Sequence, residues 1–199
     1  MNWYVYCEND PVNKIDPNGL DPDNYVMVKY SVEKIGGRIV GYDSDRLIAY
    51  IEYNGMSVGY QLDRVVQIQD DNGDVVTRGI GNVDSLYEFM ASMGYGGSPI
   101  DLLHNPEDPF NSMNEAAYAW ALRYNKQSIT GTNSEGGTGY ELGSYIYLNR
   151  EEGTYFFGYP ASNREANSMT FGAQNKAVAV IHSHGTDDWG IICLLYTSP

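Results

Sequence analysis

Between residues 25 and 80 the sequence is made of short runs in which apolar and polar residues alternate. Period-two alternation favours half-buried strands, and turn-forming pairs such as Gly36-Gly37 and Asn54-Gly55 separate the runs. An Asn-Gly pair between two alternating runs also predicts a tight β-hairpin. We therefore expect strands within 24–32, 37–43, 46–55 and 56–62, and a strand-rich segment over 21–100.

A short helix is predicted next, over 84–94, with Asp84 as its N-cap and Gly94 as its stop. Residues 95–111 are rich in glycine, proline and asparagine and indicate a boundary. His104 lies alone in this stretch, where a histidine is more often solvated than a ligand. We assign it a structural role only.

A capping signature opens the C-terminal part of the chain, where Ser112 and Glu115 have the Ser-x-x-Glu spacing of a helix N-terminus. One apolar face follows at helical spacing. Its members are Met113, Ala116, Ala117, Trp120, Ala121 and Tyr124. The cap explains Glu115, which therefore needs no catalytic role.

Two histidines stand one residue apart at the end of an apolar run, in "KAVAVIHSH". The run predicts a buried strand over 177–181, preceded by an aromatic hairpin around the turn "NREEG". Side chains two apart on a strand share a face, so His182 and His184 would point to the same side. That arrangement suits two imidazoles on one metal ion, although strand-end histidines without a metal are also common.

Composition excludes some classes of function. The chain has 26 acidic and 12 basic residues, a formal net charge of −14, and it should repel phosphate backbones. We therefore expect no nucleic-acid binding held by general electrostatics. No apolar run reaches the roughly 18 residues of a membrane helix, and the N-terminus lacks the pattern of a signal peptide. The two cysteines, Cys7 and Cys193, form no disulfide or metal-binding pattern.

The N-terminal stretch "NWYVYCENDPVNKIDPNGL" resembles the closing repeat of the Rhs/YD-repeat core. The matching positions are Asn2, Tyr4, Tyr6, Asn9, Pro11, Asp16, Pro17, Gly19 and Leu20. The resemblance implies that residues 1–20 end the shell of a larger secreted bacterial protein, which cleaves itself after Leu20. It also implies that Asp16 belongs to the shell's own protease and that the part beyond is a toxin.

The C-terminal part resembles the JAMM metalloproteases (the MPN or JAB type), in which Glu-x-Gly on one strand precedes a strand ending in His-Ser-His. Here these positions are Glu141, Gly143 and His182 to His184. The resemblance implies that His182 and His184 bind zinc with a later aspartate, and that Glu141 takes a proton from metal-bound water. Zinc hydrolysis needs these parts: three protein ligands, an open position and a base.

An uncharacterised family of Rhs C-terminal domains, domain of unknown function 4329, resembles the chain over 112–188. The shared order is an Ala-rich helix, Ser128-Ile129, Glu141 to Ile146, Tyr159-Pro160 and His182 to Gly185. Position 183 is serine or threonine in that family, and we assign Ser183 no chemical role. Asp187 and Asp188 could approach a metal from the loop, but the Ser-x-x-Asp of JAMM proteins is absent.

The last residues, "CLLYTSP", are what one reading frame of a common transposase sequencing adapter encodes. We expect 193–199 not to belong to the natural protein, so Cys193 is neither a ligand nor a nucleophile. The C-terminal domain, 112–192, would then be cut short before its third ligand. We accordingly expect weak zinc binding, or none, by this chain.

Taken together, the sequence predicts an α+β or α/β protein: an Rhs remnant, a strand-rich segment over 21–100 and an incomplete JAMM-like domain with the layered arrangement of cytidine deaminases. The predicted function is a zinc-dependent peptidase or isopeptidase toxin, secreted or delivered into a target cell. Its expected partners are the Rhs shell, an immunity protein and a peptide or protein substrate. A non-catalytic binding or processing module, and a toxin of other chemistry such as a nuclease, are the alternatives.

Overall fold

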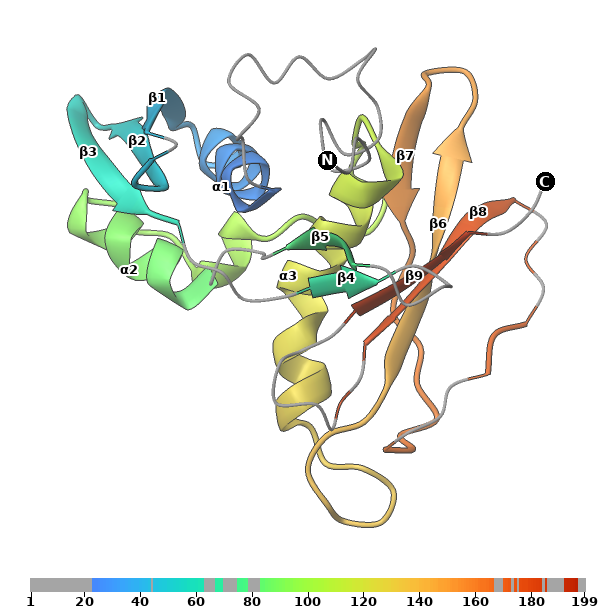
Figure 1. The fold of residues 1–199 in the computed structure, drawn as a ribbon. Coiled ribbons are helices and arrows are strands. Elements are labelled where there is room, and N and C mark those ends of the chain that lie inside the picture. The colour runs from blue at the N-terminus through green and yellow to red at the C-terminus, as the bar shows by residue number, and fades with distance from the viewer. Residues whose placement is uncertain are drawn as a thin grey trace.

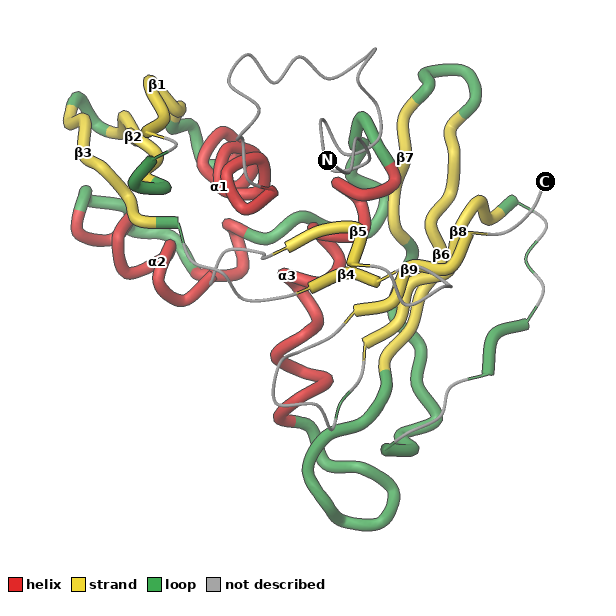
Figure 2. Tube along the Cα trace, in the orientation of Figure 1, coloured by secondary structure: helices red, strands yellow, loops and turns green. Residues whose placement is uncertain are grey.

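The described part of the chain is a mixed α+β structure with two separate β-sheets (Figure 1). The computed structural model describes residues 23–43, 45–62, 67–69, 75–78, 83–166, 170–172, 174, 176–183, 185 and 192–196. The small sheet and one helix lie at one end of the molecule, and the large sheet lies at the other (Figure 2). No helix in this described part is both long and apolar enough to cross a membrane.

The small sheet contains β1 (Arg38–Asp43), β2 (Ile48–Tyr53) and β3 (Met56–Gln61), paired antiparallel in that order. Asn54 and Gly55 form the two-residue turn between β2 and β3, with φ angles of 50° and 76°. Both angles lie in the left-handed region that a type I′ turn requires. The predicted hairpin and the strands over 37–62 are therefore confirmed.

The strand expected within 24–32 is wrong, because these residues form helix α1 (Asp23–Lys34). Its buried side chains are Met27, Val28, Ser31 and Val32, a spacing that fits one face of a helix. In a segment this short, the same apolar residues can fit both strand alternation and the helical period. Packing of the segment against two apolar clusters favours the helix. Gly36, with φ of 84°, ends the helix in the left-handed conformation.

Helix α2 (Val83–Ser92) confirms the predicted short helix, and Gly94 follows it with φ of 89°. The predicted N-cap is wrong: Asp84 lies in the first helical turn. A 3-10 helix, η2 (Pro99–Leu102), comes next within the predicted boundary region. Leu102 and Phe110 are almost fully buried there, so this stretch packs into the molecule.

Helix α3 (Met113–Thr130) begins at the predicted cap, where Ser112 Oγ accepts a hydrogen bond from the Glu115 amide over 3.2 Å. The Glu115 carboxylate accepts from the Asn111 amide at 2.9 Å and from the Tyr30 hydroxyl at 3.4 Å. The predicted apolar face is confirmed, with Trp120 fully buried. Glu115 therefore has a structural role that links the helix start to α1.

The large sheet has six strands in the order β5-β4-β9-β8-β6-β7. Its members are β4 (Gln67–Gln69), β5 (Val75–Arg78), β6 (Leu142–Asn149), β7 (Thr154–Phe157), β8 (Ala177–Ser183) and β9 (Ile192–Tyr196). The β6–β7 hairpin and the buried strand β8 confirm their predictions. All pairs are antiparallel except β4 with β9, which is parallel. Helix α3 packs against β6, β7 and β8.

Strand β9 is formed largely by the residues that we expect to be foreign to the natural protein. It pairs with β8, placing Cys193 across from His182, and buries Leu194. Strand pairing needs only an open edge and a suitable apolar pattern, whatever the origin of the segment. The prediction about residues 193–199 therefore stays a prediction.

Two apolar clusters form the core, and α1 contributes to both. One cluster joins α3 to the large sheet and includes Met27 from α1. The other joins the small sheet to α2 and includes Val28 and Val32. Because one helix buries side chains in both clusters, the strand-rich segment and the C-terminal domain are packed together.

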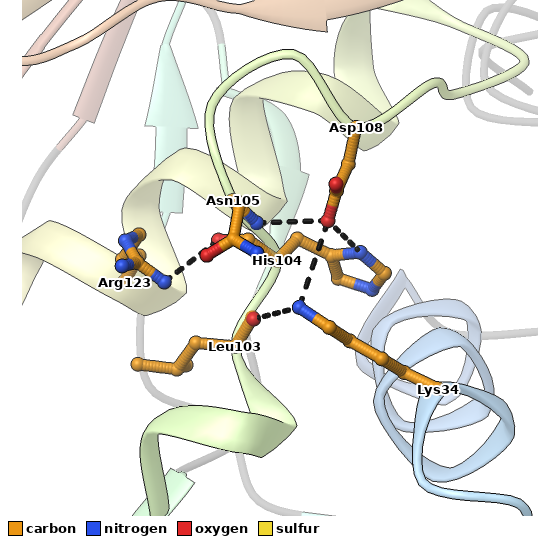
Figure 3. A network of polar contacts seen from close by, with 6 residues as sticks. All are labelled: Lys34, Leu103, His104, Asn105, Asp108 and Arg123. Atoms are coloured by element: carbon orange, nitrogen blue, oxygen red, sulfur yellow. Dashed lines mark hydrogen bonds and ion pairs between the residues drawn. The ribbon is translucent and has the colours of Figure 1, made fainter.

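A polar junction supports this packing, between α1, α3 and the loop after η2 (Figure 3). The Lys34 ammonium group donates to the Leu103 carbonyl oxygen and lies 3.6 Å from Asp108 Oδ2. His104 Nδ1 lies 3.3 Å from the same carboxylate oxygen, and Arg123 donates to the His104 carbonyl at 3.0 Å. The His104 side chain is only 11% exposed. Its role is structural, as expected, but it is packed rather than solvated.

Candidate functional site

The candidate site lies where β6 begins and β8 ends. Glu141 immediately precedes β6 and is 6% exposed. His182 is the penultimate residue of β8, and it pairs across the sheet with Gly143 of β6. Directly opposed residues of antiparallel strands share a face, as do residues two apart on one strand. The backbone therefore places Glu141 and His182 on the same face, and Gly143 adds no side chain between them.

The opposite face of these strands is packed on α3. Ala179, Ile181 and Ser183 of β8 are fully buried there, and Val180 and His182 alternate with them. On its own face the half-buried His182 ring lies 6.1 Å from the Phe171 ring, centroid to centroid. Phe171 in turn makes an edge contact with Tyr145, at 5.7 Å. His182 is thus bordered by aromatic side chains.

Both peptide groups that flank Glu141 are hydrogen-bonded at all four of their polar atoms. In the peptide group before Glu141, the Glu141 amide donates to the Glu165 carbonyl at 3.1 Å, and the Tyr140 carbonyl accepts from Ser128 Oγ at 2.8 Å. In the peptide group after it, the Glu141 carbonyl accepts from the Ser162 hydroxyl at 2.6 Å, and the Leu142 amide donates to Ser183 Oγ at 3.3 Å. The main chain at Glu141 is therefore held from the two neighbouring segments and from α3.

Ser183 and Ser128 join these contacts into one chain of hydrogen bonds. Ser183 Oγ donates to Ser128 Oγ at 2.7 Å, and both serines are fully buried. The chain runs from the Leu142 amide through Ser183 and Ser128 to the Tyr140 carbonyl. We call these two side chains the hydroxyl bridge. It links the strand that carries His182, helix α3 and the residues on both sides of Glu141.

Gly185, two residues after the end of β8, lies at the same point. A Cβ atom on Gly185 would lie 2.2 Å from the Tyr140 nitrogen and 2.4 Å from its carbonyl oxygen. Such distances are far inside van der Waals contact, so only glycine allows this approach. The residues on either side of His184, Ser183 and Gly185, both lie against the segment that leads into Glu141.

Several predicted site residues lie outside the described part of the chain. These are the candidate metal-binding residues His184, Asp187 and Asp188, and Asp16 and Leu20 of the predicted self-cleavage region. Within the described ranges, no group of three or more His, Cys, Asp or Glu side chains is placed to hold a metal ion. Imidazole and carboxylate donors are of the type that zinc prefers, but the described residues give an incomplete ligand set.

The sequence reasoning missed the roles of Ser128, Ser162 and Ser183. A signal existed for Ser183: it shares the face of Ala179 and Ile181, so alternation predicts that it is buried. A buried hydroxyl needs a hydrogen-bond partner, which would have prompted a search for one. The partner itself, Ser128, is 55 positions away and cannot be read from local pattern.

Comparison of the chain with models of protein families, with curated proteins and with solved structures found no match.

Proposed function

We propose that the chain is the C-terminal region of an Rhs-type polymorphic toxin and that residues 112–192 belong to a JAMM-like zinc hydrolase acting on peptide or isopeptide bonds. His182 and His184 would bind the metal, and Glu141 would act as the base. One observation carries the proposal: a buried glutamate immediately before β6 stands two residues from Gly143, the residue that pairs with His182 of β8. The main chain at Glu141 is held at every flanking polar atom.

This arrangement suits a base that has to be held in a defined position. Positioned acid–base groups work when their geometry is fixed before reaction, and rigid strands fix it better than loops. A bound zinc ion would supply Lewis-acid activation of water. The chain's own contribution would be to hold the main chain at Glu141 and the end of β8 that carries His182 in fixed positions.

The test is a calorimetric titration of the 199-residue chain with Zn²⁺. Because the sequence lacks the Ser-x-x-Asp of JAMM proteins, we expect a dissociation constant weaker than about 1 μM. His182→Ala and His184→Ala should each abolish the residual binding, whereas Glu141→Gln should retain it. His104→Gln is the matched control, since it removes the third histidine, and it should leave binding unchanged.

Cys193→Ser is a second control, because β9 pairs Cys193 with His182 and a cysteine can also bind zinc. Zinc binding that survives both histidine substitutions, or that depends on Cys193, would count against the proposed ligands. In the full-length protein, alanine at either histidine should abolish zinc uptake and toxicity. If both variants stayed toxic, the metallohydrolase would be ruled out.

The same assays separate the other two functions. A full-length protein that binds its partner without zinc or turnover would be a binding or processing module. Degradation of nucleic acid but not of peptide substrates would identify a nuclease. The Rhs shell, an immunity protein and delivery into a target cell remain part of the proposal.

A further inference from the structure

From the contacts around Glu141 we infer that Ser183, through Ser128, is a positioning residue that fixes the histidine-bearing end of β8 against the segment carrying Glu141. The inference deepens the proposed function and rests on it for the meaning of the site. The contacts themselves do not depend on a metal. They connect Ser128 of α3 and Ser183 of β8, the residue after His182, with the residues on both sides of Glu141.

The hydrogen bonds of the hydroxyl bridge run in one direction. The Leu142 amide donates to Ser183, Ser183 donates to Ser128, and Ser128 donates to the Tyr140 carbonyl. Each hydroxyl accepts one bond and donates one, so neither is left unsatisfied in its buried position. Bonds in such a chain polarise one another, and the loss of one hydroxyl weakens the others. The bridge should therefore behave as a unit.

The hydroxyl bridge connects the end of β8 to the main chain on both sides of Glu141. Its two ends, the Tyr140 carbonyl and the Leu142 amide, belong to the two peptide groups on either side of Glu141. Its middle, Ser183, directly follows His182 and pairs with Leu142 in the sheet. A shift of β8 relative to β6 would break the bond to Leu142, and a shift of α3 would break the bond to Tyr140. The bridge thus restrains both candidate groups together.

A steric contact at Gly185 holds the same segment without involving the hydroxyl groups. Gly185 lies against the Tyr140 main chain so closely that any side chain would collide with it. The Tyr140 amide also donates to the Ser128 carbonyl at 3.0 Å, which fixes the surface that Gly185 contacts. The end of the histidine strand is therefore held before and after position 184.

Ser144 provides a matched control for Ser183. It is also buried, at 2% exposure, and its hydroxyl donates to a backbone carbonyl, that of Gly158, at 2.8 Å. It lies on β6 two residues beyond Leu142 and pairs with Ile181 of β8 through the backbone. Its hydroxyl, however, bonds to the Gly158 and Tyr159 carbonyls and to no described residue of β8 or α3. Ser183→Ala and Ser144→Ala should lower the midpoint of thermal unfolding by similar amounts. The two variants should differ in the exchange rate of the Glu141 amide.

The experiment compares these variants by amide hydrogen exchange in the metal-free chain, followed by zinc titration. The readout is the Glu141 amide, which bonds to Glu165 and not to either serine. In Ser183→Ala it should exchange about tenfold faster, because the strand end opens locally. In Ser144→Ala it should be unchanged. Ser128→Ala should match Ser183→Ala, and the double variant should add little to either.

Ser183→Thr keeps the hydroxyl and should restore slow exchange. Where the wild-type chain binds zinc, Ser183→Ala should weaken binding about tenfold or more, as the loss of outer contacts to ligands does, with Ser144→Ala unaffected. Equal exchange in the two alanine variants, or additive effects of Ser128 and Ser183, would overturn the inference. Absence of zinc binding in the wild type would count against the proposed function, and the exchange result would still decide the role of the bridge.

Discussion

Gly185→Ala is the sharpest steric test of how the candidate site is held together. The added methyl carbon would lie 2.2 Å from the Tyr140 nitrogen, 2.4 Å from its oxygen and 2.6 Å from its carbonyl carbon. All three are main-chain atoms, so no side-chain rotation relieves the contact. The Tyr140 backbone is itself tied to Ser128 through its amide and its carbonyl, at 3.0 and 2.8 Å. Either the main chain at residue 185 or the Tyr140 main chain must therefore move away.

The cost can be worked out from these contacts. Overpacking a close contact typically costs about 1–3 kcal/mol, and a contact with fixed main chain belongs at the upper end. If Tyr140 moves instead, two hydrogen bonds are lost, at about 1 kcal/mol each. Both routes lead to a loss of about 2–3 kcal/mol. That is a large part of the stability of a domain of this size, which is about 5–15 kcal/mol.

Urea unfolding followed by tryptophan fluorescence measures this loss. With a slope of about 1–3 kcal/mol per molar urea, the midpoint should fall by about 1–3 M. Gly172→Ala is the matched control, because a Cβ atom there meets nothing within 4 Å. It should be neutral or slightly stabilising, since alanine restricts the unfolded chain. Equal midpoints for Gly185→Ala and the wild type would refute the close approach to Tyr140.

Two further predictions concern pH. Burial, and to a smaller extent Lys34, lowers the pKa of His104 below its ordinary value of 6.5, although Asp108 opposes the shift. The unfolded chain therefore binds a proton first as the pH falls below about 6.5, and His104 should cost stability there, by at most about 1.4 kcal/mol per pH unit. As the pH falls below about 6.5, the free energy of unfolding of His104→Gln, measured with urea, should rise relative to that of the wild type. A difference between the two proteins that stays constant with pH would contradict this. Burial and Glu115 raise the pKa of Tyr30 to about 12, from 10.0. The advantage of the wild type over Tyr30→Phe should be complete below pH 10 and shrink toward pH 12, and an advantage that grows over this range would disprove it.

Local signals were enough for the elements whose structure is decided locally. The Asn54-Gly55 turn needs positive φ at both positions, and few other pairs supply it, so the hairpin could be predicted. The cap at Ser112 likewise marks the start of α3. Helix α1 could not be predicted in this way, because its apolar residues fit both periods. Its contacts with α3 and η2, both distant in sequence, favour the helix.

The candidate site divides in the same way. Glu141 and His182 could be named from predicted strand ends, and the structure places Glu141 just before β6 and His182 near the end of the adjacent strand β8. What holds them could not be predicted, because the bridge joins residues 41 and 55 positions apart. Sequence pattern locates side chains on a face, whereas the contacts that fix a strand end arise only when three elements meet. The positions of the candidate site residues therefore depend on contacts between elements that are distant in sequence.

The position of α1 bears on the proposed release of the toxin. The helix begins at Asp23, three residues after Leu20, and buries Met27 in one core cluster and Val28 and Val32 in the other. A cut after Leu20 would leave α1 attached to the described residues that it packs against. The strand-rich segment would then leave the shell as part of one folded unit with the C-terminal domain.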